Sequence, residues 1–410
     1  MLERRVTHLG PPAPLRLVAG LPGGAVAAGA TDHSVALWPA LDPTPILLPP
    51  PGAAAGQLMR LVPLAPDLLI ACYQQEIVGV SLQRGGATGR LTTEHWSTLR
   101  PWPGEPGAVV VLTNHHEATI WSAREGRVLQ TLSLEGLYDG EFWEIAQVTE
   151  RRLVLVKQLV PGERGQVYDG VLSLDIPTGE PVGAYSGERA QGLGHVSAAS
   201  PGQLLTVEDR RRWTRFSDDL KPLSSFELEG NTLGGYWMGG GAVLNTSVGG
   251  RFSLVDLDHG AQSRALRLKH SCGGVFTEGG AVALWRTAPI YRPIRGKGVL
   301  YLGAAPKWRF KKLTLSGGTL YGARLGGGLL ALVPFGAPRV SLVRLDPLEE
   351  LTPSVSVPEP ILGAASTGPE PTHDRLFGHL GDPLNFATRE QEPGDLLLLH
   401  EGSVSRYGRP

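Results

Sequence analysis

The feature that most constrains the fold is a hairpin pattern that recurs nine times along the chain. Each copy has an apolar segment, a polar turn and a second segment in which apolar and polar residues alternate more. Short apolar runs bounded by turn residues predict buried strands. The first segments are 26–30, 68–72, 109–113, 153–157, 204–207, 243–246, 282–285, 329–333 and 396–400. Their partners are 34–38, 76–81, 118–121, 170–175, 212–216, 251–256, 298–303, 339–344 and 403–407.

The segment 193–228 shows what surrounds one hairpin. A strand is expected at 195–199, before a Ser200-Pro201-Gly202 turn, and a last strand ends at Leu228. One strand on either side of the hairpin makes a four-stranded antiparallel sheet. The expected first strands of successive repeats begin near Pro14, Gln57, Leu99 and Glu141. A period of about 42 residues is typical of β-propeller blades.

We therefore expect an all-β fold, a single closed β-propeller of four-stranded antiparallel blades that spans 1–410 as one domain. Nine hairpins favour eight or nine blades, with seven as the fallback, because propellers usually have about four to eight. The tail 394–407 reads as a second and a third strand without a fourth, and 4–9 reads as a lone strand. Since a ring must protect its sheet edges, we expect the N-terminal strand to pair with the C-terminal blade.

The hairpins also predict how each strand is buried. Second strands such as 109–112 and 396–399 are apolar at nearly every position, which indicates burial on both faces. Third strands such as 35–38 alternate more, which indicates half-buried strands. Departures from the period predict insertions near 158–169, 288–297 and 354–392, and long loops on a rigid scaffold are frequent binding sites.

Composition agrees with many short strands joined by tight turns. The 410 residues include 55 Gly and 34 Pro, yet 41% of the chain is apolar, which excludes a disordered chain. A net charge of −1 provides no global field to collect nucleic acid or to hold an anionic membrane. We therefore expect no membrane partner and no general nucleic-acid binding.

Cysteine usage and the N-terminus bear on location. Cys72 and Cys272 lie beside apolar residues and far apart, which favours buried thiols over a disulfide framework. The first 20 residues contain charges and prolines where a signal peptide needs an apolar run, and no stretch is long and apolar enough to span a membrane. We expect a cytoplasmic protein. Arg greatly outnumbers Lys, which fits a GC-rich bacterial genome.

The repeats resemble those of the tryptophan–aspartate (WD) repeat propellers. The resemblance rests on Gly194-His195 at the start of the fifth repeat and on three strand–turn–strand segments, 120–129, 174–182 and 255–260. The Trp-Asp dipeptide itself is absent, so the family's His-to-Asp network is mostly missing. A chain of this size is also similar to the propeller subunits of bacterial ternary systems, which implies a MoxR-type AAA+ ATPase and a von Willebrand factor A protein as partners.

No segment carries an enzyme signature. G-x-S-x-G, P-loop and H-E-x-x-H motifs are all missing from the sequence. His115-His116-Glu117 falls in a hairpin turn, where adjacent ligands cannot easily reach one metal. His373-Asp374 has no assignable nucleophile. We therefore expect no catalytic residue, no metal and no cofactor.

The candidate binding residues are aromatic and basic. The segment 307–312 holds three of the seven lysines, alternating with Trp308 and Phe310. Two interpretations stay open: a solvated strand face, or a basic patch for an acidic protein surface, a phosphate or nucleic acid. Trp102 and Trp143 are expected near the surface, since Trp beside Arg is typical of interface hot spots. The full candidate set is Trp102, Trp143, Arg210, Arg211, Arg292, Arg295, Lys297, Lys307, Arg309 and Lys311.

These observations favour a non-enzymatic scaffold that binds one or more proteins, as a subunit of a bacterial assembly. The first alternative is a sensor that binds a small ligand or an anion in the propeller channel. The second alternative is a propeller hydrolase or lyase.

Overall fold

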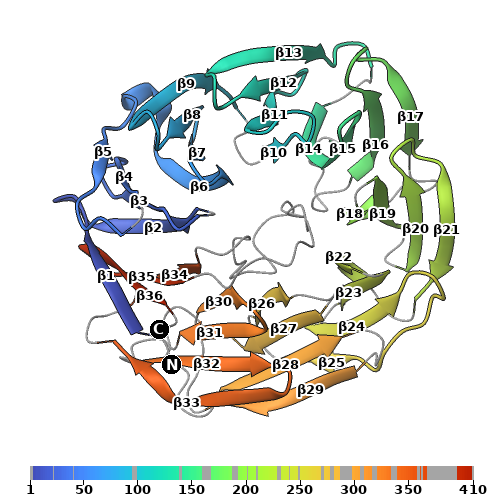
Figure 1. Ribbon diagram of the computed structural model, residues 1–410. Helices are drawn as coiled ribbons and strands as arrows, with labels where there is room; N and C mark the ends of the chain where they lie inside the picture. Colours follow the sequence, from blue (N-terminus) through green and yellow to red (C-terminus); the bar gives the residue numbers. More distant parts are fainter. Residues whose placement is uncertain are drawn as a thin grey trace.

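The chain folds, in a computed structural model, into a closed ring of nine antiparallel blades (Figure 1). The count of nine refers to the residues that the structure describes. These are 3–21, 23–39, 41–94, 99–137, 141–158, 168–186, 193–200, 202–208, 211–228, 232–239, 241–247, 250–268, 272–277, 281–286, 298–304, 309–315, 321–333, 339–357, 361, 363–366 and 395–408.

Each blade is a meander of four strands, numbered along the chain from the centre of the ring outward. Blade 1 contains β2 (Leu15–Gly20), β3 (Val26–Ala30), β4 (Val35–Trp38) and β5 (Ile46–Leu48). Blade 2 contains β6 (Leu58–Ala65), β7 (Leu68–Tyr73), β8 (Glu76–Ser81) and β9 (Gly86–Thr92). Blade 3 contains β10 (Arg100–Pro101), β11 (Ala108–Asn114), β12 (Glu117–Ser122) and β13 (Arg127–Ser133).

The middle three blades continue this order. Blade 4 contains β14 (Glu141–Val148), β15 (Arg152–Gln158), β16 (Tyr168–Asp175) and β17 (Pro181–Ser186). Blade 5 contains β18 (Leu193–Ser200), β19 (Gln203–Glu208), β20 (Arg212–Ser217) and β21 (Pro222–Glu227). Blade 6 contains β22 (Thr232–Gly239), β23 (Ala242–Ser247), β24 (Arg251–Asp256) and β25 (Leu266–Arg267).

The last three blades complete the ring. Blade 7 contains β26 (Cys272–Thr277), β27 (Ala281–Arg286), β28 (Val299–Ala304) and β29 (Arg309–Thr314). Blade 8 contains β30 (Tyr321–Gly326), β31 (Leu329–Val333), β32 (Arg339–Leu345) and β33 (Leu348–Ser356). Blade 9 contains β34 (Gly363–Ser366), β35 (Leu396–Leu399), β36 (Ser403–Gly408) and, from the other end of the chain, β1 (Glu3–Leu9).

The predicted hairpins are confirmed, because all nine form the second and third strands of the nine blades. Nine blades is the upper value of the expected range, and the fallback number of seven is wrong. Blades 4 and 5 share one continuous eight-stranded sheet, since Tyr168 at the start of β16 pairs with Leu193 of β18. The other blades are separate four-stranded sheets.

The predicted closure of the ring is confirmed. Strand β1 pairs antiparallel with β36, and Glu3 lies opposite Gly408, so the two ends of the chain are adjacent (Figure 1). A backbone hydrogen bond from Leu9 to Pro43 and another from Leu15 to Glu401 connect blade 9 to blade 1. The outer strand of the last blade is thus supplied by the first residues of the chain, which leaves no interruption in the ring.

The burial pattern corrects one expectation from the sequence. Second strands such as β7 and β35 are buried along their whole length, as predicted. Third strands such as β4 and β36 are also buried throughout, whereas half-burial was expected. Neighbouring blades cover both faces of the two middle strands, so alternation appears in the outer strands, for example in β17. Trp38, Trp121, Trp213 and Trp285 are fully buried in these inter-blade cores.

The three strand–turn–strand segments that resemble WD repeats share one turn geometry. In two of them an aspartate ends the third strand, and its carbonyl accepts a hydrogen bond from a glycine four residues later: Gly179 to Asp175 and Gly260 to Asp256. In the third, Gly126 donates to Ser122. All three glycines have a φ between 65° and 73°, which an L side chain rarely adopts.

The expected insertions fall partly outside the described residues. Strand β15 ends at Gln158 and β16 begins at Tyr168, and the residues between them are not described. The segment 288–297 lies wholly outside the described residues. The range 354–392 begins with the end of β33 and contains β34, and its larger part, from 367, is not described.

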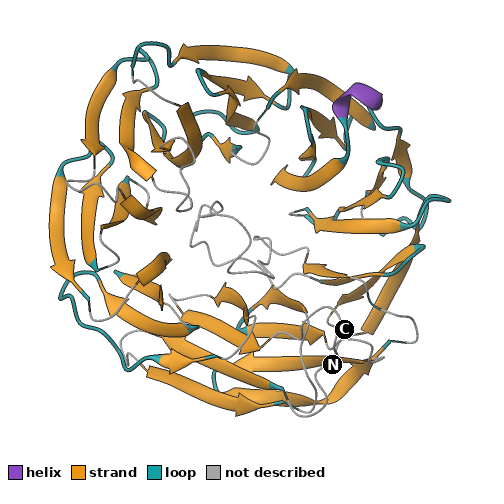
Figure 2. Ribbon diagram, turned by 180° about the vertical axis from the view of Figure 1, so that it is seen from behind, coloured by secondary structure: helices purple, strands orange, loops and turns teal. Residues whose placement is uncertain are grey.

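Helical structure is minor in the part of the chain that the structure describes. One 3-10 turn, Ala53–Ala55, connects blades 1 and 2 and is drawn in purple in Figure 2. None of the described helical residues forms a helix of the length and apolarity needed to cross a membrane.

Candidate functional site: a polar rim on blades 3 to 5

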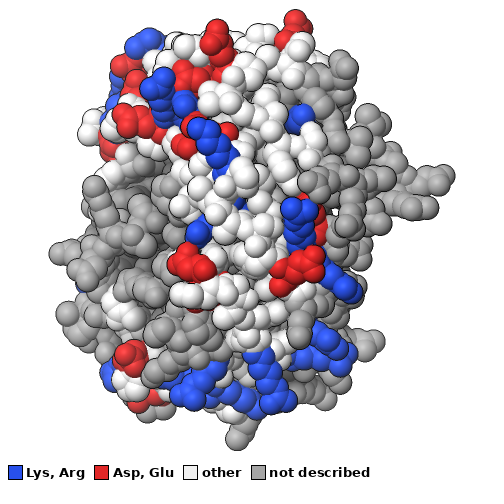
Figure 3. Space-filling view, turned by 90° about the vertical axis from the view of Figure 1, so that its right-hand side faces the viewer, with Lys and Arg blue, Asp and Glu red and all other residues white. Residues whose placement is uncertain are grey.

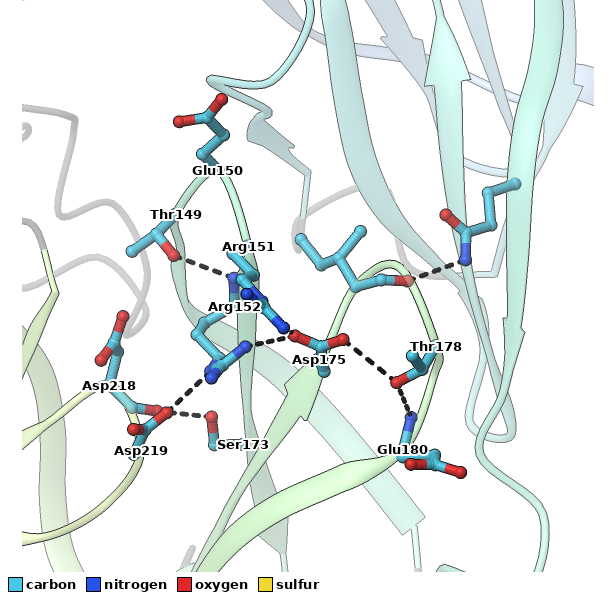
Figure 4. Close-up of polar contacts among 12 residues, drawn as sticks. Thr149, Glu150, Arg151, Arg152, Ser173, Asp175, Thr178, Glu180, Asp218 and Asp219 are labelled. Carbon is cyan, nitrogen blue, oxygen red and sulfur yellow. Dashed lines mark hydrogen bonds and ion pairs between the residues drawn. The ribbon is translucent and has the colours of Figure 1, made fainter.

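Two sets of turns share one face of the ring. Because the strands of each blade are antiparallel, the turn between its first and second strands and the turn between its third and fourth strands lie at the same end. We call the surface formed by these turns the turn face. On blades 4 and 5 it carries charged residues from three turns, β14–β15, β16–β17 and β20–β21, which Figure 4 shows at close range.

The turn between β14 and β15 is the centre of this site. Thr149 and Arg152 are joined by a backbone hydrogen bond of 2.8 Å, and the Thr149 hydroxyl accepts a second bond from the Arg152 amide at 2.9 Å. These two bonds fix a tight turn that places Glu150 and Arg151 at its tip. The Ile176 amide donates to the Arg151 carbonyl at 2.9 Å, so the turn is also tied to the adjacent turn of the same blade.

Arg152 connects blade 4 to blade 5. Its Nε donates to Asp219 Oδ1 of blade 5 at 2.7 Å, and its Nη1 donates to Asp175 of its own blade (Figure 4). The Arg152 side chain is only 16% exposed, and that of Asp219 is 31% exposed. A second bond crosses the same junction, from the Ser173 hydroxyl to the Asp218 carbonyl. The junction between these blades is therefore held by charge-assisted hydrogen bonds.

Asp175 is the shared acceptor of the site. Arg151 Nε donates to its Oδ1 at 2.7 Å, and the Thr178 hydroxyl donates to its Oδ2 at 3.1 Å. The hydrogen bond from Arg151, assisted by Thr178 and by the charges of both arginines, lowers the pKa of Asp175 below its ordinary value. The hydrogen bond to Asp219 raises the pKa of Arg152. The carboxylate and the guanidinium groups are thus charged and fixed in place.

Trp102 borders this cluster from blade 3. Its Nε1 donates to the Glu150 carbonyl of blade 4 at 3.2 Å, and its ring is partly buried against the core between blades 3 and 4. A Cβ on Gly104 would clash with the indole ring, so glycine is required beneath it. Trp102 therefore contacts the turn that carries Glu150 and Arg151, and the Arg151 side chain is 71% exposed.

Arginine–aspartate pairs recur at neighbouring junctions. Arg124 of blade 3 forms a bidentate pair with Asp67 of blade 2, at 2.8 and 2.9 Å. Arg215 of blade 5 pairs with Asp258 of blade 6 at 2.9 Å. Such pairs connect adjacent blades in a chain that lacks most of the His-to-Asp network of WD repeats. They make the turn face of this half of the ring a preorganised surface.

The structure describes four of the ten candidate residues in full. Trp102 belongs to the site above. Arg211 is exposed in the turn before β20, and Arg309 and Lys311 are exposed on β29. Trp143 lies in β14, and its side chain is outside the description. Arg210, Arg292, Arg295, Lys297 and Lys307 lie outside the described residues.

The sequence did not single out Arg151, Arg152, Asp175 or Asp219. One signal was present, because Asp175 and Asp256 occupy the same place in two of the segments that resemble WD repeats. The pairing of Arg152 with Asp219 had no such signal, since the two residues are 67 positions apart. Trp102, which the sequence places near the surface, is half-buried, and Gly104 leaves room for its indole ring.

Among the described residues, no group of three or more His, Cys, Asp or Glu side chains is placed to hold an ion. Four aspartates of the turn face, Asp67, Asp175, Asp219 and Asp258, are engaged by arginines. Such an arrangement provides a fixed surface of alternating charge with an aromatic ring at its edge.

The comparisons with known proteins agree with this class of fold. The chain is similar to the C-terminal WD40 domain of Sif2, with a TM-score of 0.50 and 13% identity over 100% of this chain and 99% of that one. Sqt1 from Saccharomyces cerevisiae gives a TM-score of 0.50 and 12% identity over 100% and 99% of the two chains. The computationally designed Ika8 protein gives 0.51 and 12% over 81% and 96%.

These likenesses establish a WD40-like β-propeller fold. Identities of 12 to 13% show the fold alone. Protein-family models and curated proteins give no match to this chain.

Proposed function

We propose that the protein is a non-enzymatic scaffold whose turn face on blades 3 to 5 docks a partner protein. The observation that carries the proposal is the bond from Trp102 to the turn that bears the exposed Arg151, on a rim where Arg152 joins blades 4 and 5. Trp and Arg dominate the binding energy of protein interfaces because they combine a large contact area with directed hydrogen bonds. A preorganised rim also loses little conformational entropy on binding.

The finer part of the proposal is an assembly of bacterial, cytoplasmic proteins. The similarity to propeller subunits of ternary systems makes a MoxR-type AAA+ ATPase and a von Willebrand factor A protein the first partners to test. A WD40-like fold supports this reading in a general sense, because such rings present many turns around a rigid frame.

The test uses the protein purified gently from its own host, with interface variants made at the turn face. Arg151→Glu is the sharper variant, because its side chain is mostly exposed. It also removes the bond to Asp175, so thermal unfolding checks its fold. Trp102→Ala is the second variant, with circular dichroism and thermal unfolding to check its fold. Loss of a stoichiometric partner from both variants, with retention by Arg84→Glu on blade 2, supports docking at this face. Equal retention by all three proteins contradicts it.

The same preparation separates the scaffold from the two alternatives. A small ligand that raises the melting temperature in a saturable manner favours the sensor. Bound metal, with an activity that a chelator abolishes, favours the hydrolase or lyase.

A further inference from the structure

The outer rim of blades 6 and 7 carries basic side chains that have no acidic partner among the described residues. Figure 3 looks at this rim and shows Lys and Arg gathered at its lower end, at the height where Figure 1 places β25 and β29. The residues are all exposed: Arg251, Arg264, Arg267, Arg309, Lys311 and Lys312. We call this set the basic rim.

Packing places the two halves of the basic rim side by side. Leu266 of β25 and Phe310 of β29 pack against the same apolar core between blades 6 and 7. A Cβ built on Gly303 of blade 7 would lie 2.6 Å from the Phe310 ring and 3.3 Å from Leu254 of blade 6. Since Leu266 and Phe310 turn inward, the neighbouring Arg267, Arg309 and Lys311 are directed to solvent.

The charges of the basic rim are not relieved by any carboxylate that the structure describes. Arg251 and Arg267 lie directly opposite each other on β24 and β25, which is an unfavourable like-charge pair. Among the described residues, none of the six forms an ion pair. The nearest carboxylates in sequence are engaged elsewhere: Asp256 accepts from His259 and Asp258 pairs with Arg215.

Other parts of the rim differ in this respect. Arg90 of the outer strand β9 pairs with Glu76, and Arg127 of the outer strand β13 pairs with Glu125. The outer-strand arginines of blades 2 and 3 are thus neutralised locally. An unneutralised cluster on two adjacent outer strands indicates that an external anion supplies the missing charge.

We propose that the basic rim docks an acidic, extended polypeptide segment of a partner protein. Arg309 and Lys311 are two residues apart on one strand, roughly 6.6 Å, which matches the spacing of alternate residues in an extended peptide. Acidic side chains at alternate positions can therefore face both cations. A nucleic acid is disfavoured, because Phe310, the aromatic residue of the patch that the structure describes, is turned inward and cannot stack on a base. This inference rests on the proposed scaffold function and names the chemistry of a second contact.

The experiment measures binding of a fluorescein-labelled peptide of about twelve residues in which Glu alternates with Ser, roughly 40 Å when extended. The test protein carries Arg267→Glu and Lys311→Glu. The matched control carries Arg84→Glu and Arg127→Glu on blades 2 and 3, which changes the net charge by the same amount. A peptide with Gln in place of Glu and an oligothymidine of similar length complete the set.

We expect the wild type and the matched control to bind the acidic peptide equally, and the test protein to bind it about tenfold more weakly. Binding by the wild type weakens as salt rises from about 50 to about 300 mM. Equal binding by test and control proteins overturns the inference, as does tighter binding of the oligothymidine or equal binding of the Gln peptide. Failure of the scaffold function appears separately, as the absence of any stoichiometric partner in the purified protein.

Discussion

Arg406 Nε donates to Asp395 Oδ2 at 2.6 Å, and the other end of the same guanidinium donates from Nη1 to the Gly24 carbonyl at 2.6 Å. Arg406 and Asp395 belong to blade 9, whereas Gly24 lies in the first turn of blade 1. Both charged side chains are about nine-tenths buried. This pair therefore joins the last blade to the first, at the place where the two ends of the chain close the ring.

We expect Arg406→Met to lower the free energy of unfolding by about 3 kcal/mol, because it leaves a buried carboxylate with a weaker partner. Arg5 is that partner, at 3.6 Å with a side chain 42% exposed. Arg5→Met should cost less than about 1 kcal/mol, as exposed pairs do. Thermal unfolding of the two variants decides the matter, and equal melting temperatures would contradict the closure role of Arg406.

The ring closure should also depend on pH through His8. His8 is fully buried on β1 against Trp38 of blade 1, with ring centroids 5.4 Å apart. Its Nδ1 donates to the Asp42 carbonyl at 2.8 Å, and its Nε2 has no hydrogen-bond partner among the described residues. Burial lowers the pKa of His8 below 6.5, and the charge of Arg406 acts in the same direction.

Because the unfolded chain binds this proton at a higher pH than the folded ring, stability is lost as pH falls below about 6.5. We expect the melting temperature to fall between about pH 7.5 and pH 5.5, and His8→Phe to reduce that fall. His259→Asn is the control of opposite sign. Asp256 raises the pKa of His259, so the stability that His259 contributes to the fold is present at low pH and is lost as pH rises. A His8→Phe profile identical to the wild type would disprove the role of His8.

Gly126 tests the turn that three repeats share. Its φ is +72°, and a Cβ at this position would meet the Thr88 carbonyl of blade 2. Gly136 has the same backbone conformation, with φ +73°, and open space around the Cβ position. Gly136→Ala should cost about 1–2 kcal/mol for the left-handed backbone, and Gly126→Ala about 2 kcal/mol more for the clash. Equal costs, measured by urea unfolding, would show that the blades separate freely at this point.

The junction between blades 4 and 5 depends on Arg152. We expect Arg152→Met to lower the free energy of unfolding by about 1–2 kcal/mol, because two charge-assisted hydrogen bonds are lost. Arg211→Met is the matched control: its exposed side chain has no ion pair among the described residues, and its removal should stay within about 0.5 kcal/mol. If both variants unfold alike, Asp219 does not bind Arg152 in solution.

Local patterns made most of the fold predictable. The alternation of a strand and the Gly, Pro or Asp of a turn depend on adjacent residues. The hairpin of 68–72 with 76–81 and the closure by 4–9 could therefore be inferred from sequence. Contacts between blades are not local. Arg152 and Asp219 are brought together only by the ring, and the full burial of β4 depends on its neighbouring blades. Arg309 and Lys311 are neighbours in the sequence, so they were identified as basic candidates. Arg251 and Arg267 are brought together only by the pairing of β24 with β25, so they were not.

The most direct test of the scaffold is the mass of the native assembly. The protein is tagged in its own host, purified gently and weighed by native mass spectrometry beside Arg151→Glu and Arg84→Glu. We predict a defined stoichiometric complex with one or two other proteins for the wild type and for Arg84→Glu, and the bare chain for Arg151→Glu. A wild-type chain that is alone, or that carries only a metal or a small ligand, would contradict the account.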